Sequence, residues 1–92
     1  AFKQFLFELV YASRNDKQMQ VAAANAITAL NYAKVPFSGL DLSGVRIPHA
    51  NLRNAILDGA NFSNANLDNV NFSGASLNNT ELNRSSMDTV SF

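Results

Sequence analysis

The sequence has no cysteine, only two prolines and four glycines among its 92 residues, and no excess of charge of either sign. Without cysteine there are no disulfides, and the redox compartment cannot be read. Seven basic and seven acidic residues cancel, so the net charge gives no reason to expect nucleic acid or an anionic membrane as a partner. No apolar run approaches the roughly 18 residues of a membrane span, and the start lacks a signal peptide's charged segment and cleavage site. These absences favour a cytoplasmic protein.

Glycine and proline are missing altogether before Pro36, and this first segment has the pattern of helices. Its opening apolar residues recur at helical spacing and form one stripe: Phe2, Phe5, Leu6, Leu9 and Val10. Asn15 or Asp16 can then N-cap a second, alanine-rich helix, which Pro36 ends because the residue before a proline is pushed out of the α region. We therefore predict an N-terminal helical cap over residues 1–34, with helices at about 2–13 and 16–34.

The rest of the chain, residues 35–92, has a period of five. A large apolar residue stands at every fifth position and predicts a core: Phe37, Leu42, Ile47, Leu52, Leu57, Phe62, Leu67, Phe72, Leu77, Leu82, Met87 and Phe92. Two positions earlier in each unit the residue is small or β-branched, and the other three positions are polar, with Ile56 as the clear exception.

Five residues fit the period of neither a helix nor a strand, so the chain must turn a corner in every unit. All four glycines stand two residues after the large apolar residue, a position otherwise often held by asparagine. A type II turn needs positive φ at its third residue, which glycine and asparagine tolerate best. Four such turns close a circuit of 20 residues, and circuits paired like strands stack about 4.8 Å apart. The period thus predicts a mainly β fold, a quadrilateral β-helix of about three coils.

The repeated units resemble a known family. Ala50-Asn-Leu-Arg-Asn, Ala60-Asn-Phe-Ser-Asn and Ala65-Asn-Leu-Asp-Asn are similar to the pentapeptide-repeat family, whose unit is A-(D/N)-L-x-x. The resemblance covers residues 35–92 and implies a right-handed quadrilateral β-helix. The junction from Asn25 to Gly44 is also similar to helix-to-repeat junctions in large multidomain proteins of bacterial type, which implies that the chain is a segment of a longer protein.

Residues that carry chemistry are few, and each has a place in the repeat. His49, the only histidine, falls at a turn beside Pro48, and the serines fill outward positions. Asp68 and Asp88 share one column with no histidine or cysteine nearby, and are interpreted as two solvated carboxylates that repel weakly. Outward columns of asparagine are expected to hydrogen-bond along the stack. We therefore predict no catalytic residue, metal site or cofactor, and a protein that is not an enzyme.

Three outward residues are candidates for a contact surface. Ile56 is apolar at a position where the repeat is polar, and it is expected to meet the helices or a partner. Arg46 and Arg53 lie on neighbouring faces and mark a candidate basic spot. The last coil has no predicted cap, so we expect further repeats, or a second copy in a homodimer, to cover it.

The favoured function is a non-catalytic protein–protein interaction or scaffold module with an unidentified protein partner, no nucleic acid and no membrane. The alternative follows from the resemblance, since some members of the family mimic duplex DNA and modulate DNA gyrase or topoisomerase, as in quinolone resistance. That mimicry needs a long, strongly acidic rod. Three arginines against five carboxylates in residues 35–92, spread over about three coils, argue against it.

Overall fold

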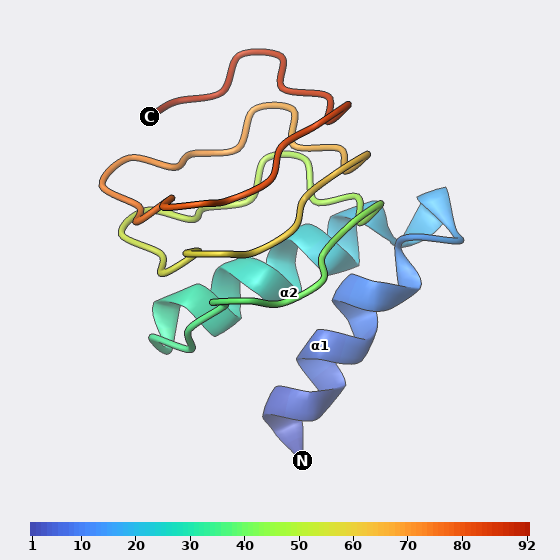
Figure 1. Ribbon diagram of the computed structural model, residues 1–92. Helices are drawn as coiled ribbons and strands as arrows, with labels where there is room; N and C mark the ends of the chain where they lie inside the picture. The colour runs from blue at the N-terminus through green and yellow to red at the C-terminus, as the bar shows by residue number, and fades with distance from the viewer.

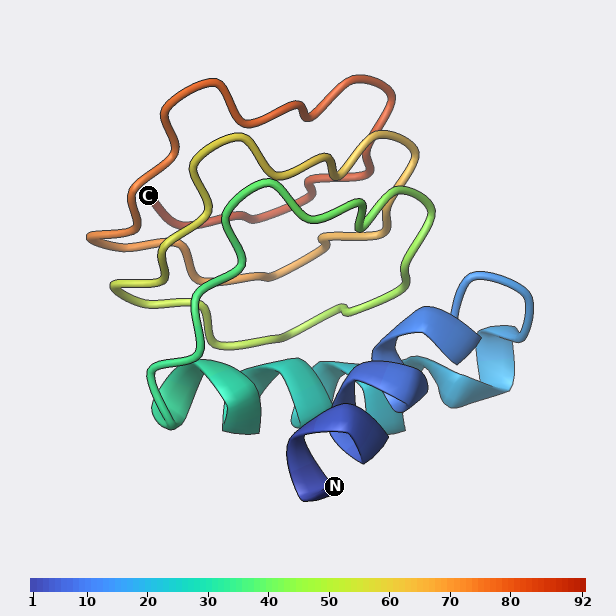
Figure 2. The same ribbon diagram turned by 60° about the horizontal axis from the view of Figure 1, so that its bottom comes forward.

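The computed structural model describes residues 1–92 as two helices followed by stacked coils of chain (Figure 1). Helix α1 spans Phe2–Ala12, the 3₁₀ turn η1 spans Lys17–Met19, and helix α2 spans Gln20–Tyr32. The first coil is residues 37–56, the second 57–76 and the last 77–92. Figure 2 shows α2 lying across the base of the first coil, with α1 packed beside it at the same end of the stack. The last coil and the C-terminus lie at the opposite end.

Helix α2 fits closely under the first coil because its buried face is mostly alanine. Ala23, Ala24 and Ala26 are buried together with Ile27 and Leu30, and small side chains let backbones approach. Its start is delayed relative to residue 16 because Asp16 caps η1 instead, accepting a 2.9 Å hydrogen bond from the Gln18 amide.

The end of α2 is a Schellman motif. The Lys34 amide donates to Asn31 O (2.8 Å), and the Val35 amide donates to Leu30 O (3.0 Å). These two bonds satisfy carbonyls that the end of a helix leaves free. Lys34 takes a left-handed φ of 65°, and Pro36 follows at once, so the chain leaves the helix directly into the first coil.

The coils stack through backbone hydrogen bonds between residues about 20 apart in sequence. The Phe37 amide donates to Ile56 O, the Gly39 amide to Asp58 O and the Asn61 amide to Leu40 O, each at 2.9 Å. The pattern recurs up the stack and produces seven isolated parallel bridges between residues i and i+20, such as Asp41↔Asn61 and Asn61↔Glu81. The 20-residue circuit expected from the period is therefore the register between coils.

The predicted fold class, a mainly β right-handed quadrilateral β-helix, is wrong. The structure contains no sheet and no strand longer than one bridged residue, and its only regular elements are helices. The physical reason lies in the turns. A two-residue turn in every unit of five breaks the extended backbone on both sides of each bridge, so no ladder of consecutive pairs can form. The repeat region is a stack of turns joined by single bridges.

Each turn places its third residue at positive φ. Gly59 at 74° is typical, and asparagine holds the position in four units, for example Asn64 at 63°. Three residues tolerate it less well: His49, Arg84 and Thr89, at 68°, 59° and 58°. The columns of asparagine were predicted to hydrogen-bond along the stack. Instead, the side chains of the asparagines at the bridge positions accept from backbone amides two residues further along the chain. Asn61 Oδ1 accepts from the Ser63 amide at 2.8 Å, which fixes the entry to the turn.

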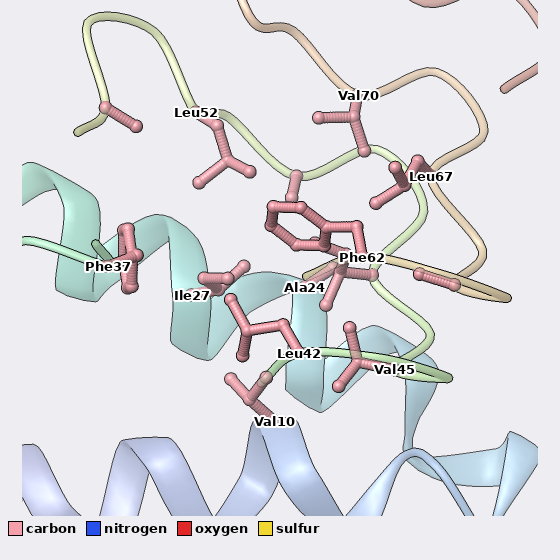
Figure 3. Packing of buried hydrophobic residues seen from close by; sticks show 14 of the residues in the cluster. Val10, Ala24, Ile27, Phe37, Leu42, Val45, Leu52, Phe62, Leu67 and Val70 are labelled. Atoms are coloured by element: carbon pink, nitrogen blue, oxygen red, sulfur yellow. The ribbon is translucent and has the colours of Figure 1, made fainter. Parts of the chain in front are cut away.

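The large residue of each unit points into the stack. The first eight of the predicted core residues are buried: Phe37, Leu42, Ile47, Leu52, Leu57, Phe62, Leu67 and Phe72. Leu77, Leu82 and Met87 in the last coil are only partly buried, and Phe92 is 68% exposed. Figure 3 shows Val10 of α1 and Ile27 of α2 beside Leu42. One apolar cluster thus includes the helices and the coils, and the division into domains 1–34 and 35–92 stays a prediction.

Candidate interaction surfaces

Two side chains of the helical segment act as donors to the lower edge of the first coil. Arg14 Nε donates to Ser43 O at 2.7 Å, and its Nη2 donates to Asp41 O. Asn31 Nδ2 donates to Arg53 O at 3.0 Å and to Asn51 O at 3.3 Å. These carbonyls face the side where a preceding coil would supply amides. Each of the two side chains therefore takes the place of two backbone amides.

Two hydroxyls act as acceptors at the same edge. The Arg46 amide donates to Ser13 Oγ at 2.9 Å, and the Asn51 amide donates to Thr28 Oγ1 at 2.9 Å. Ser13 Oγ in turn donates to Val10 O at 2.6 Å. Ser13, Arg14, Thr28 and Asn31 form the capping quartet of the first coil. A free edge of paired backbone is prone to association, and the quartet satisfies six backbone groups of this edge.

The sequence did not predict the capping quartet. One available signal was the position of Thr28 and Asn31, which follow the buried Ile27 and Leu30 by one residue each and lie three apart, on one side of α2. Nothing comparable marks Ser13 and Arg14, whose partners lie 27 to 33 residues further along the chain.

Arg46, a predicted surface residue, is engaged inside the molecule. Its Nη1 donates to Ser13 O at 3.0 Å and to Arg14 O at 3.4 Å, just beyond the C-terminal end of α1. A cation there is favourable because the last carbonyls of a helix carry partial negative charge. Arg46 is thus held by the helical segment, and the basic spot formed with Arg53 stays a prediction.

Arg53 and Ile56, the other two predicted surface residues, lie in one open groove. The α2 groove, about 790 Å³ in volume, runs between the end of α2 and the first coil, and Tyr32 and Lys34 also line it. Tyr32 is 90% exposed and Ile56 is 47% exposed. Half of the Ile56 side chain is thus accessible on the groove wall, and its contact with the helices or a partner stays a prediction.

A second, smaller depression lies between the start of α2 and the first two coils. His49 and Asp68 line it together with Gln20, whose Oε1 is buried without a hydrogen-bond partner. His49 occupies a turn at positive φ. No group of three His, Cys, Asp or Glu side chains lies close enough to hold a metal ion.

The side chains of two aspartates form hydrogen bonds to the next coil. Asp68 Oδ1 accepts from the Ser86 hydroxyl and, at 2.9 Å, from the Asp88 amide. Asp58 Oδ1 repeats the arrangement with Ser76 and Asn78, at 2.6 and 2.9 Å. The interpretation of Asp68 as a solvated carboxylate therefore missed a bond between coils that Asp58, ten residues earlier, also forms.

Hydrogen bonds lower the pKa of two exposed carboxyls, those of Asp68 and Asp41. The Ser86 hydroxyl, then the Asp88 amide, holds the pKa of Asp68 below its ordinary value of 3.8. The Ser43 hydroxyl and amide do the same for the pKa of Asp41, to which Arg14 is ion-paired at 3.6 Å. Hydrogen bonds to the charged form of a carboxyl favour that form.

We expect the folded state to lose stability as the pH falls below about 3.8. A carboxyl whose pKa is lower in the folded protein than in the unfolded chain stabilises the fold above the unfolded-state pKa. That stabilisation is lost as the pH falls through the folded-state pKa. Urea unfolding at a series of pH values measures this loss. In Asp68→Asn, which keeps an acceptor oxygen but no titrating proton, the decline should be shallower. Equal declines in both proteins would show that Asp68 is not a source of the acid sensitivity.

The upper edge of the stack has no counterpart of the capping quartet. The Leu82 and Met87 amides donate to no backbone carbonyl, whereas the equivalent Phe62 and Leu67 amides donate to Glu81 O and Ser86 O at 2.8 Å. Beside these amides lie the partly buried Leu82 and Met87 side chains and the exposed Phe92. Residues 77–92 thus form an open edge of the stack.

The stacked five-residue units, with one edge bonded by side chains and the other edge unpaired, define a repeat-protein module. The family model for "Pentapeptide repeats (8 copies)" matches residues 37–74 and 49–84. The chain therefore belongs to the pentapeptide-repeat family, which confirms the resemblance of its units. Neither a curated protein nor a solved structure matches it. None of its helices combines the length and the apolar character that crossing a membrane requires.

Proposed function

We propose that residues 1–92 form a non-catalytic protein-interaction module, and that in a chain of these 92 residues a second copy binds the open edge. The observation that carries the proposal is the difference between the two edges. Four side chains satisfy backbone groups of the first coil. The corresponding groups of the open edge lack protein partners.

The open edge combines the two features that favour association. Unpaired backbone donors lie next to apolar side chains that are partly buried, Leu82 and Met87, or exposed, Phe92. Burying such side chains is worth roughly 25 cal/mol per Å² of apolar surface, and the pairing of edge amides gives direction to the contact.

A second copy suits this edge because the last coil carries exposed charges of both signs. Glu81 and Asp88 carry negative charge and Arg84 carries positive charge, and none of them forms an ion pair within the chain. In a two-fold contact the same patch faces itself, so a patch that bears both signs can pair across the axis. The alternative of gyrase modulation through DNA mimicry is not favoured by any observation on this surface.

Analytical ultracentrifugation tests the proposal. We expect the chain to show a reversible monomer–dimer equilibrium at concentrations up to about 1 mM, the range of a weak contact. Phe92→Glu should shift this equilibrium to monomer, since a buried carboxylate without a partner is unfavourable. Val21→Glu is the matched control, because Val21 is 67% exposed and Phe92 is 68% exposed, but Val21 lies on α2 at the other end.

Circular dichroism of both variants checks that they remain folded. A chain that stays monomeric throughout this concentration range would contradict the second copy as partner. So would a dimer that Phe92→Glu leaves intact or that Val21→Glu dissociates.

A further inference from the structure

The α2 groove lies at the other end of the stack from the open edge, and its shape is fixed by hydrogen bonds. Asn31 and Thr28 line the groove and bond to the backbone of Asn51 and Arg53 in the first coil. Helix α2 and the coil cannot separate here without breaking these bonds. The groove is therefore a preformed feature of the fold, and binding to it requires little reorganisation.

Two apolar side chains are exposed along this groove without a structural reason. Tyr32 is the last residue of α2 and makes no hydrogen bond through its hydroxyl. Ile56 holds a position that is polar in all the other bridged units, such as Asn61 and Ser76. Exposed aromatic and aliphatic groups that gather beside polar ones are typical of contact surfaces.

The charge of the groove has one sign. Lys34 and Arg53 line it, and no aspartate or glutamate does. Neither cation forms an ion pair, since the single ion pair of the molecule joins Arg14 to Asp41. Arg14 and Arg46 are held by hydrogen bonds to backbone carbonyls, whereas the guanidinium of Arg53 has no such bond. Two free cations thus lie beside two exposed apolar side chains.

We propose that the α2 groove binds an acidic peptide segment that carries an apolar side chain. Carboxylates of the peptide pair with Lys34 and Arg53, and its apolar side chain packs between Tyr32 and Ile56. A nucleic acid fits less well, because two cations in a chain of zero net charge offer far fewer phosphate contacts than nucleic-acid sites employ. The proposal does not depend on self-association through the open edge.

Nuclear magnetic resonance titration with three synthetic peptides tests the site. The first probe is acetyl-Ser-Asp-Leu-Glu-Asp-Leu-Ser-amide; the second replaces its acids by Asn and Gln, and the third replaces its leucines by serine. At up to about 1 mM, the range of weak binding, the first should shift the amide signals of Asn31, Arg53 and Asn54. The other two should bind at least about five-fold more weakly, as expected when an ion pair or an apolar contact is lost.

Variants assign the binding to the groove. The double variant Lys34→Gln with Arg53→Gln should weaken the first peptide about ten-fold, a change typical of losing two exposed ion pairs. Lys17→Gln, which removes an exposed cation outside the groove, should leave its affinity unchanged. Tyr32→Ser should weaken binding of the first peptide, but the affinity should depend on salt concentration as before, because the ion pairs with Lys34 and Arg53 remain.

Three outcomes would overturn the proposal. The first is the absence of signal shifts up to the highest peptide concentration. The second is equal binding of the acidic and the neutral peptide, and the third is a stronger response of the same amides to oligo-deoxythymidine than to the acidic peptide. Because all the substituted side chains are exposed, an unchanged thermal unfolding curve will show that each variant is folded.

Discussion

Phe62→Ala should lower the free energy of unfolding by about 3–5 kcal/mol. Phe62 is fully buried in the second coil, between coils on both sides, and its ring packs edge-on to that of Phe72 with the centroids 6.3 Å apart. Removal of the Phe62 ring leaves a cavity. The backbone of the neighbouring coils cannot move in to fill it, because bridges and turns fix the position of each unit. Since a domain of this size is stable by only about 5–15 kcal/mol, the loss is a large share of the total.

Urea unfolding monitored by circular dichroism measures this change. Phe92→Ala is the matched control, because it removes the same side chain from the same place in the five-residue unit. Phe92 is exposed and only stacks on Phe72, at 5.7 Å between centroids. We expect that variant to lose less than about 1.5 kcal/mol. Equal losses in the two variants would mean that Phe62 is not at the centre of the core.

Ser13→Ala should lower the free energy of unfolding by about 1–3 kcal/mol, although it removes a single oxygen atom. Ser13 is the only fully buried polar residue. Its hydroxyl accepts from the Arg46 amide and donates to Val10 O. Alanine leaves the Arg46 amide without a partner, whereas Val10 O keeps only its bond from the Ser13 amide at 3.2 Å, and this is why the effect exceeds that of an ordinary serine.

Ser63→Ala supplies the comparison in the same urea experiment. Ser63 stands at a turn, and its hydroxyl forms no hydrogen bond, so the substitution should change stability by no more than about 0.5 kcal/mol. If Ser13→Ala were as mild as Ser63→Ala, the closure of the first coil by the helical segment would have to be abandoned.

The five-residue period was sufficient to predict the family, the 20-residue register and the direction of the large side chains. Such features depend on local turn chemistry, for example on glycine or asparagine at positive φ, and each unit repeats the information. The burial of each core residue was not predictable in the same way. Leu57 and Leu77 are equivalent in the sequence, yet only Leu57 lies between two other coils.

The predicted mainly β class failed because parallel pairing was taken to imply strands. Pairing between residues 20 apart is present, but a turn after every bridge leaves nothing longer than one pair. The capping quartet could not be predicted from periodicity either. Its contacts join residues 20 to 33 apart, for instance Asn31 and Asn51, and they depend on how α2 lies against the coil, which no repeated pattern encodes.

Residue-resolved hydrogen exchange of the backbone amides tests the central claim, that one edge of the stack is closed by side chains and the other is open. It is best carried out at a protein concentration where the monomer prevails. We predict that the Arg46 and Asn51 amides, which donate to Ser13 and Thr28, exchange slowly. The Leu82 and Met87 amides, which have no acceptor, should exchange almost as fast as in an unfolded chain. Fast exchange at Arg46 and Asn51, or protection of Leu82 and Met87 in the monomer, would contradict the claim.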